Sequence, residues 1–182
     1  LRFPMEANST CYYLNRFNDT IEKWIGCLND YTLGMLCRKP QPDSWSLGQV
    51  YIHIIDDTGY FIGQMKTALL KDVNREKEMH KYARSLFEQD GFPDALLEGP
   101  ATNTSVRQPN SKDELLQALL SIKEEINRLY LTFDFSNSRG KAEHPGFLFF
   151  NALEWLRFAE MHMRHHFRQK ERIDERILSN KD

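Results

Sequence analysis

Cysteine is scarce in this sequence. The three cysteines, Cys11, Cys27 and Cys37, are odd in number, and no two of them form a C-x-x-C pair. A disulfide framework normally uses an even number of cysteines in a short secreted chain, and structural zinc sites use closely spaced pairs. We therefore expect reduced thiols that serve as small apolar groups or have no role, and no nucleophile among them.

Long apolar runs and an excess of charge are also absent. No run approaches the roughly 20 apolar residues that span a bilayer, and the N-terminus has no apolar segment typical of a signal peptide. Lys and Arg number 24 against 26 Asp and Glu, for a formal net charge of −2. This balance gives no electrostatic basis for binding nucleic acid or a membrane surface. We expect a cytoplasmic protein with neither partner.

Motifs of several common enzyme classes are missing as well. The sequence has no glycine-rich phosphate-binding loop and no G-x-S-x-G nucleophile elbow. Apolar residues make up 41% of the 182 residues, which is enough for the core of one domain. Because no repeat or domain boundary is visible, we expect a single domain over residues 1–182.

Helical periodicity is the strongest pattern that is present. Apolar residues recur at spacings of three and four, which predicts helices over residues 9–36, 46–73, 111–133 and 151–178. Three of these helices open with a capping pattern, a small polar residue followed three positions later by Glu or Gln, at Ser46, Ser111 and Asn151. Little of the sequence has the alternation of a β-strand.

The connection over residues 74–110 breaks this periodicity. It contains several helix-breaking residues and a short predicted helix over residues 76–87. A link of this length in a compact domain usually crosses over a bundle or shapes a site. Four amphipathic helices with one long crossover connection predict an all-α four-helix bundle.

Two histidines lie on the apolar stripe of the last predicted helix. His162 and His166 are four residues apart, so their rings project to the same side, one turn apart. Burying two imidazoles is unfavourable unless hydrogen bonds or a metal ion satisfy their nitrogens. Both rings can reach one ion at about 2.0–2.1 Å. His165 points partly away. An exposed face is expected to carry Glu160, Arg164, Arg168 and Glu171.

His53 is the best candidate for a third ligand. It lies on the second predicted helix, in a row with Asp57 at the edge of the apolar stripe. His80 and His144 fall in irregular segments, and His144, which precedes a proline, is expected to have a structural role. Asp57 and Gln169 are either partners for ring N–H groups or ordinary polar residues.

Three imidazoles would leave at least one coordination position open, as in catalytic rather than structural sites. An open position can hold water, a thiolate or a substrate oxygen. Imidazole ligands suit zinc, nickel or ferrous iron, so ligand type does not choose among these metals.

Two segments of the sequence resemble one family. Trp45-Ser46-Leu47-Gly48-Gln49, followed by His53, resembles the W-S-x-x-[EQ]-x-x-x-H opening of the second helix in the DinB-like superfamily. Gly140, His144-Pro145 and the stretch NALEWLRFAEMHMRHHFRQ, which ends at Gln169, resemble the region of its last helix. The segments occur in the family's order, and the likeness covers nearly all of the chain.

This resemblance implies a DinB-like four-helix bundle in which His53, His162 and His166 hold a divalent metal, most often zinc or nickel, with iron as an option. Many members of the superfamily form homodimers. Some are metal-dependent transferases that activate bacillithiol, mycothiol or glutathione against an electrophile, and a related branch isomerises maleylpyruvate with the help of a thiol. Many others have no assigned activity.

The first functional hypothesis is therefore a metal-dependent S-transferase. Its partners would be a low-molecular-weight thiol and an electrophile, the latter in a pocket shaped by residues 74–110. One alternative is a metal-dependent hydrolase, for which the sequence identifies no general base. The other is a stress-related metal-binding bundle without catalysis, which a fourth protein ligand such as His165 would favour.

Overall fold

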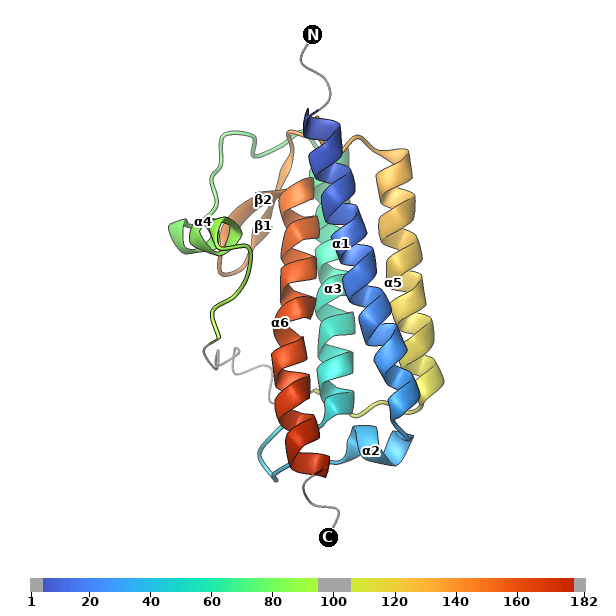
Figure 1. Ribbon diagram of the computed structural model, residues 1–182. Helices are drawn as coiled ribbons and strands as arrows, with labels where there is room; N and C mark the ends of the chain where they lie inside the picture. Colours follow the sequence, from blue (N-terminus) through green and yellow to red (C-terminus); the bar gives the residue numbers. More distant parts are fainter. Residues whose placement is uncertain (1–4, 95–105, 179–182) are drawn as a thin grey trace.

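Four long helices dominate the computed structural model, which describes residues 5–94 and 106–178 (Figure 1). They are α1 (Met5–Cys27), α3 (Leu47–Leu70), α5 (Lys112–Thr132) and α6 (Ala152–Leu178). The helices lie side by side, and their apolar stripes meet in one core. Its largest fully buried side chains include Phe17, Ile21, Trp24, Tyr51, Ile54, Met65, Leu115 and Trp155. The all-α bundle predicted from the sequence is confirmed.

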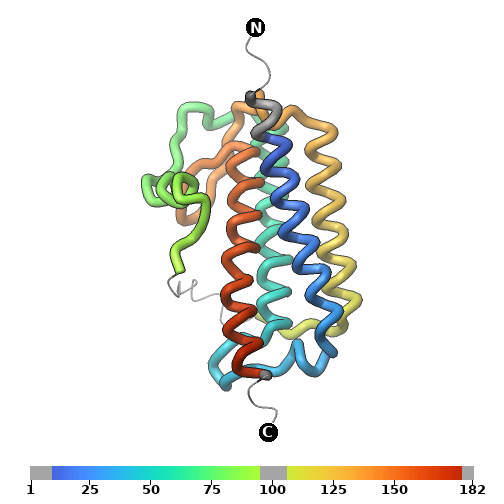
Figure 2. Tube along the Cα trace, in the orientation of Figure 1, coloured from blue at the N-terminus to red at the C-terminus, as the bar shows by residue number. Residues whose placement is uncertain are grey.

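The order of the helices in space explains the long connection. Both α5 and α6 pack against α1 and against α3. Along the tube of Figure 2, α1 and α6 run in one direction and α3 and α5 in the other. Because α3 and α5 are parallel, the chain between them must return along the length of the bundle. This is the predicted crossover. Its residues 95–105 lie outside the described part of the chain.

The predicted capping residues begin their helices. Ser46 Oγ accepts a hydrogen bond from the backbone N–H of Gln49, and the Gln49 side chain accepts one from Ser46, so both halves of the capping box are formed. Ser111 caps α5 through its side chain. At the start of α6, Asn151 and Glu154 exchange two side-chain-to-backbone bonds of 2.7 and 2.8 Å.

The first predicted helix is shorter than expected. Instead of continuing over residues 9–36, α1 ends at Cys27 and is followed by a 3-10 turn (Leu28–Asp30) and the short helix α2 (Leu33–Cys37). Tyr31 is extended, and the Thr32 side chain accepts from Met35 N to start α2. Residues such as Asn, Asp and Thr favour caps and turns over helix interiors, which explains the break.

A β-hairpin was not predicted. Strands β1 (Lys141–His144) and β2 (Leu148–Asn151) pair antiparallel, with Lys141 opposite Asn151 and His144 opposite Leu148. Two strands of four residues give too little alternation to stand out in a sequence. The hairpin packs against α3 and α6, with Ala142 and Phe150 buried beneath it.

The short helix α4 (Lys81–Glu88) begins five residues later than predicted. His80 caps it, because its Nδ1 accepts from Tyr82 N at 3.2 Å. The ring of Phe87 packs edge-on against Phe150 of the hairpin, at 5.3 Å between centroids. Figure 1 shows α4 beside the hairpin, outside the four-helix layer.

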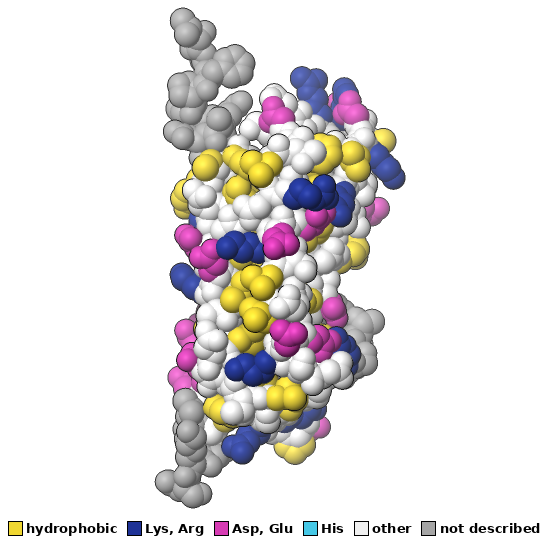
Figure 3. Space-filling view, turned by 90° about the vertical axis from the view of Figure 1, so that its right-hand side faces the viewer, with side chains coloured by type: hydrophobic (Ala, Val, Ile, Leu, Met, Phe, Trp, Pro, Cys, Tyr) yellow, Lys and Arg dark blue, Asp and Glu magenta, His cyan; other side chains and the backbone are white. Residues whose placement is uncertain are grey.

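The surface agrees with the balanced charge of the sequence. On the face shown in Figure 3, hydrophobic side chains are interrupted by basic and acidic ones. Within the two described ranges, no helix is long and apolar enough to cross a bilayer.

Candidate metal centre

Three histidines converge between α3 and α6. His53 comes from the first third of α3, and His162 and His166 come from successive turns of α6. A ring nitrogen of each lies within 4.8 Å of a ring nitrogen of the other two, and the Nε2 atoms of His162 and His166 are 3.2 Å apart. The structure therefore brings together the three residues that the sequence selected.

Burial keeps these imidazoles neutral. It lowers the pKa of His53 to about 4 and that of His166 to about 3. The pKa of His162 is well below its ordinary value, first because of burial and then because His166 and His53 are close. A neutral imidazole offers a nitrogen lone pair, and this is the form that binds metal ions.

Hydrogen bonding fixes the tautomer of one ring. His166 Nδ1 lies 2.8 Å from Gln169 Oε1. Since an amide oxygen only accepts, Nδ1 carries the proton and Nε2 presents its lone pair to His162. Gln169 is thus the partner of a ring N–H group, one of the two alternatives that its position in the sequence left open. By contrast, His162 Nδ1 is buried without a hydrogen-bond partner among the described residues.

The cluster fits a divalent cation. Two ligands bonded at 2.0–2.1 Å in a tetrahedral site are about 3.4 Å apart, close to the 3.2 Å between the Nε2 atoms of His162 and His166. Without an ion, those two nitrogens face each other at the edge of a buried core. The donor set, three neutral imidazoles, suits zinc, nickel or ferrous iron.

Asp57 lies beside the cluster, close to one ring nitrogen of His53 and one of His162. Its Oδ2 is 3.6 Å from His53 Nε2 and 3.5 Å from His162 Nε2. It therefore faces the nitrogens that point into the cluster. Burial, and then the nearby charge of Asp56, raise the pKa of Asp57 to about 6, although its side chain is still 40% exposed.

Aromatic rings surround the histidines. The ring centroid of Trp45 is 5.1 Å from that of His53, and Phe61 is 5.6 Å from His162. A place for Phe61 beside the histidines was not predicted, although residues 53, 57 and 61 share one helical face. These rings shield the cluster from water, which strengthens electrostatic interactions within it.

The other histidines have different surroundings. His144 ends β1, where its Nδ1 accepts from Gly146 N at 3.1 Å and its ring stacks on Trp155, as its predicted structural role requires. Burial lowers its pKa to about 4. His165 contacts Phe92 and Arg168, outside the three-histidine cluster.

The prediction that Glu160 lies on an exposed face is wrong. Its side chain is buried and accepts bonds from Thr20 Oγ1 at 3.0 Å, from Arg16 at 3.2 Å and from Arg164 at 2.9 Å. The face of α6 that carries Glu160 packs against α1, which supplies two of these three partners. Arg164 also donates to the backbone oxygen of Asp90.

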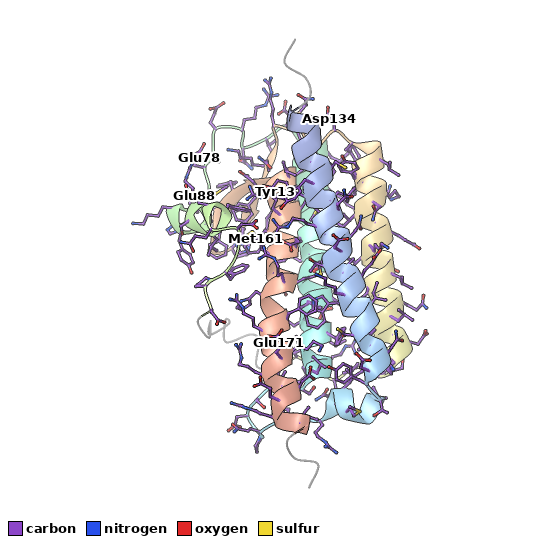
Figure 4. All side chains as sticks on the ribbon, in the orientation of Figure 1. Tyr13, Glu78, Glu88, Asp134, Met161 and Glu171 are labelled. Atoms are coloured by element: carbon purple, nitrogen blue, oxygen red, sulfur yellow. The ribbon has the colours of Figure 1, made fainter. Side chains whose placement is uncertain are left out.

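A cavity of about 350 Å³ lies where this side of α6 meets the segment after α4. Phe92, Met161, His165 and Arg168 are among the residues that line it, and Figure 4 labels Met161 on α6. A second cavity, of about 360 Å³, is formed by residues 68–72, 75 and 137–140. Neither is lined by the three clustered histidines, so chemistry and not cavity size identifies the candidate site.

The comparison with known families agrees with this geometry. The family model of the DinB superfamily matches residues 16–169, which include α3, α5, the first two thirds of α6 and all three histidines. No curated protein and no solved structure matched the chain. The match spans most of the chain and both helices of the histidine cluster. The chain therefore belongs to the DinB superfamily.

Proposed function

We propose that this protein is a metal-dependent S-transferase, in which His53, His162 and His166 hold a divalent cation that activates a low-molecular-weight thiol against an electrophile. The observation that carries the proposal is the convergence of three buried, neutral imidazoles from two packed helices. Zinc and nickel are the first candidates for the ion, with iron next.

The residues of the chain would prepare the site in three ways. Burial holds the imidazoles in the unprotonated form, and Gln169 orients His166. Trp45 and Phe61 limit the access of water. A bound cation would lower the pKa of a coordinated thiol, so that it reacts as the thiolate at neutral pH. A cytoplasmic location, a homodimer and an electrophile pocket near residues 89–92 belong to the same proposal.

Thiol consumption tests this function. Metal-loaded protein would be mixed with glutathione, bacillithiol or mycothiol and a chromogenic aryl halide, and loss of free thiol would be followed. We expect turnover by the wild type, and by His80→Asn, which keeps a capping side chain on α4. His166→Ala should lose both metal and turnover. Turnover that survives removal of the metal would contradict the proposal.

A metal-dependent hydrolase is the second candidate, and one observation favours it. Such an enzyme needs a general base beside the cation, and the carboxylate of Asp57 lies 3.5 Å from His162 Nε2. Hydrolysis of an activated ester in the absence of any thiol, lost in Asp57→Asn, would support this alternative. A metal-binding bundle without catalysis would show neither activity.

A further inference from the structure

Asp57 lies beside two of the three clustered histidines, on the same helix as His53. His53 and Asp57 are four residues apart on α3, and His162 and His166 are four residues apart on α6. Residues at this spacing project to the same side of a helix. Because α3 and α6 pack directly against each other, the two pairs face one another.

Two distances from Asp57 agree with those between neighbouring ligands of one ion, although Asp57 lies outside the group of three histidines whose ligand atoms are all within 4.8 Å of one another. In a tetrahedral site with bonds of 2.0–2.2 Å, neighbouring ligand atoms are about 3.3–3.6 Å apart. Asp57 Oδ2 lies 3.5 and 3.6 Å from the Nε2 atoms of His162 and His53. The Nε2 atoms of His162 and His166 are 3.2 Å apart, which is close to the same range.

The absence of a cationic side chain beside Asp57 also favours a bound cation at this position. Within the described residues, the ionisable side chains within 4 Å of its carboxylate are those of His53 and His162, and no Lys or Arg pairs with it. Glu160, an acidic side chain that is buried on α6, is by contrast already paired with Arg16 and Arg164. A partly buried carboxylate without a Lys or Arg partner is unfavourable, and a divalent cation held by the neighbouring imidazoles would supply the missing positive charge.

We propose that the carboxylate of Asp57 is the fourth protein ligand of the cation held by His53, His162 and His166. This inference rests on the proposed metal site and specifies its resting state. Four protein ligands fill a tetrahedral site. A substrate that binds the ion must therefore displace one of these ligands or bind as a fifth ligand. Asp57 is the ligand to be displaced, since its side chain is 40% exposed, against 9% for His53 and 12% for His162.

Cobalt binding tests the inference without any enzyme assay. Co²⁺ would be titrated into chelator-treated wild type, Asp57→Asn, Asp57→Ala, Asp56→Asn and His53→Ala, with circular dichroism to verify that each variant is folded. Affinity comes from competition with a coloured chelator, and the ligand field from the visible d–d bands. Asp56→Asn is the matched control, because it removes the same charge at the adjacent, exposed position.

We expect substitutions of Asp57 to weaken Co²⁺ binding and the substitution of Asp56 to leave it unchanged. Both Asp57 variants should bind Co²⁺ at least about 10-fold more weakly than Asp56→Asn, with shifted d–d bands, while Asp56→Asn matches the wild type. If the Asp57 variants equal Asp56→Asn in affinity and spectrum, the fourth ligand is wrong and the three-histidine site stands, provided that His53→Ala fails to bind. If wild-type protein binds no Co²⁺, both the inference and the proposed function are wrong.

Discussion

Gln169 Oε1 lies 2.8 Å from His166 Nδ1, one turn further along α6. This bond sets which nitrogen of His166 faces the cluster, so its loss should weaken metal binding without removing a ligand. We predict that Gln169→Ala still binds one equivalent of metal, with an affinity about 10–100-fold lower. Gln117→Ala, on the exposed side of α5, is the control. Equal affinities of the two variants would contradict the orienting role.

The metal-free protein should lose stability as the solution becomes acidic. An unfolded histidine titrates near pH 6.5, whereas burial lowers the pKa of folded His53 to about 4 and that of His166 to about 3. Between these values the unfolded chain binds more protons, so the free energy of unfolding falls as pH drops from about 7 towards 4. Urea midpoints measured in EDTA should therefore decrease over this range.

Asp57 titrates with the opposite effect on stability. Burial raises its folded pKa to about 6, so the folded chain gains protons before the unfolded one and this residue stabilises as pH falls. The Asp57→Asn variant should consequently lose stability more steeply than the wild type between pH 6.5 and 5. If the urea midpoints of both proteins stayed constant over this pH range, the predicted effect of histidine burial on stability would be wrong.

Loss of the Glu160 carboxylate should destabilise the bundle. Glu160→Gln leaves Arg16 and Arg164 without their buried partner, but both arginines are partly exposed and also reach Asp90. We therefore expect a cost of about 1–3 kcal/mol, below that of a fully buried pair. The matched change at an exposed position, Glu171→Gln, should cost less than about 0.5 kcal/mol. Chemical denaturation measures both. Equal stabilities would contradict the buried network.

Two glycines near the hairpin should respond differently to the same substitution. A Cβ atom at Gly140 would collide with the backbone oxygens of Ala68 and Lys71, whereas one at Gly146 would meet nothing within 4 Å. We predict that Gly140→Ala destabilises the protein by about 2 kcal/mol or more, and that Gly146→Ala is nearly neutral. Thermal unfolding of the two variants measures both effects. Equal losses of stability would show a general effect of alanine and not a collision with the backbone of α3 at Gly140.

Local signals explain what could be predicted from the sequence. Ser46 and Gln49 carry a complete capping pattern, and the helix begins there. The pair His162 and His166 depends only on helical spacing, so its shared face was predictable before any packing was known. His53 required a choice among few candidates, and the packing of α3 against α6 brings it to the pair.

Contacts between distant segments explain what could not be predicted. Glu160 has the sequence environment of an exposed residue, and its burial depends on Thr20 and Arg16 of another helix. The side of the cluster that Asp57 faces depends on where α6 places His162. The hairpin is stabilised in part by packing on α3 and α6. This packing could not be predicted from the sequence of two strands of four residues.

Elemental analysis of the purified protein measures whether His53, His162 and His166 hold a metal ion. Wild-type protein, His53→Ala, His162→Ala and the control His165→Ala would be analysed for zinc, nickel and iron after exposure to each metal and removal of excess. We predict about one equivalent of metal in the wild type and in His165→Ala, and none in the two cluster variants. Wild-type protein that takes up no metal, or cluster variants that keep it, would contradict a metal site at His53, His162 and His166.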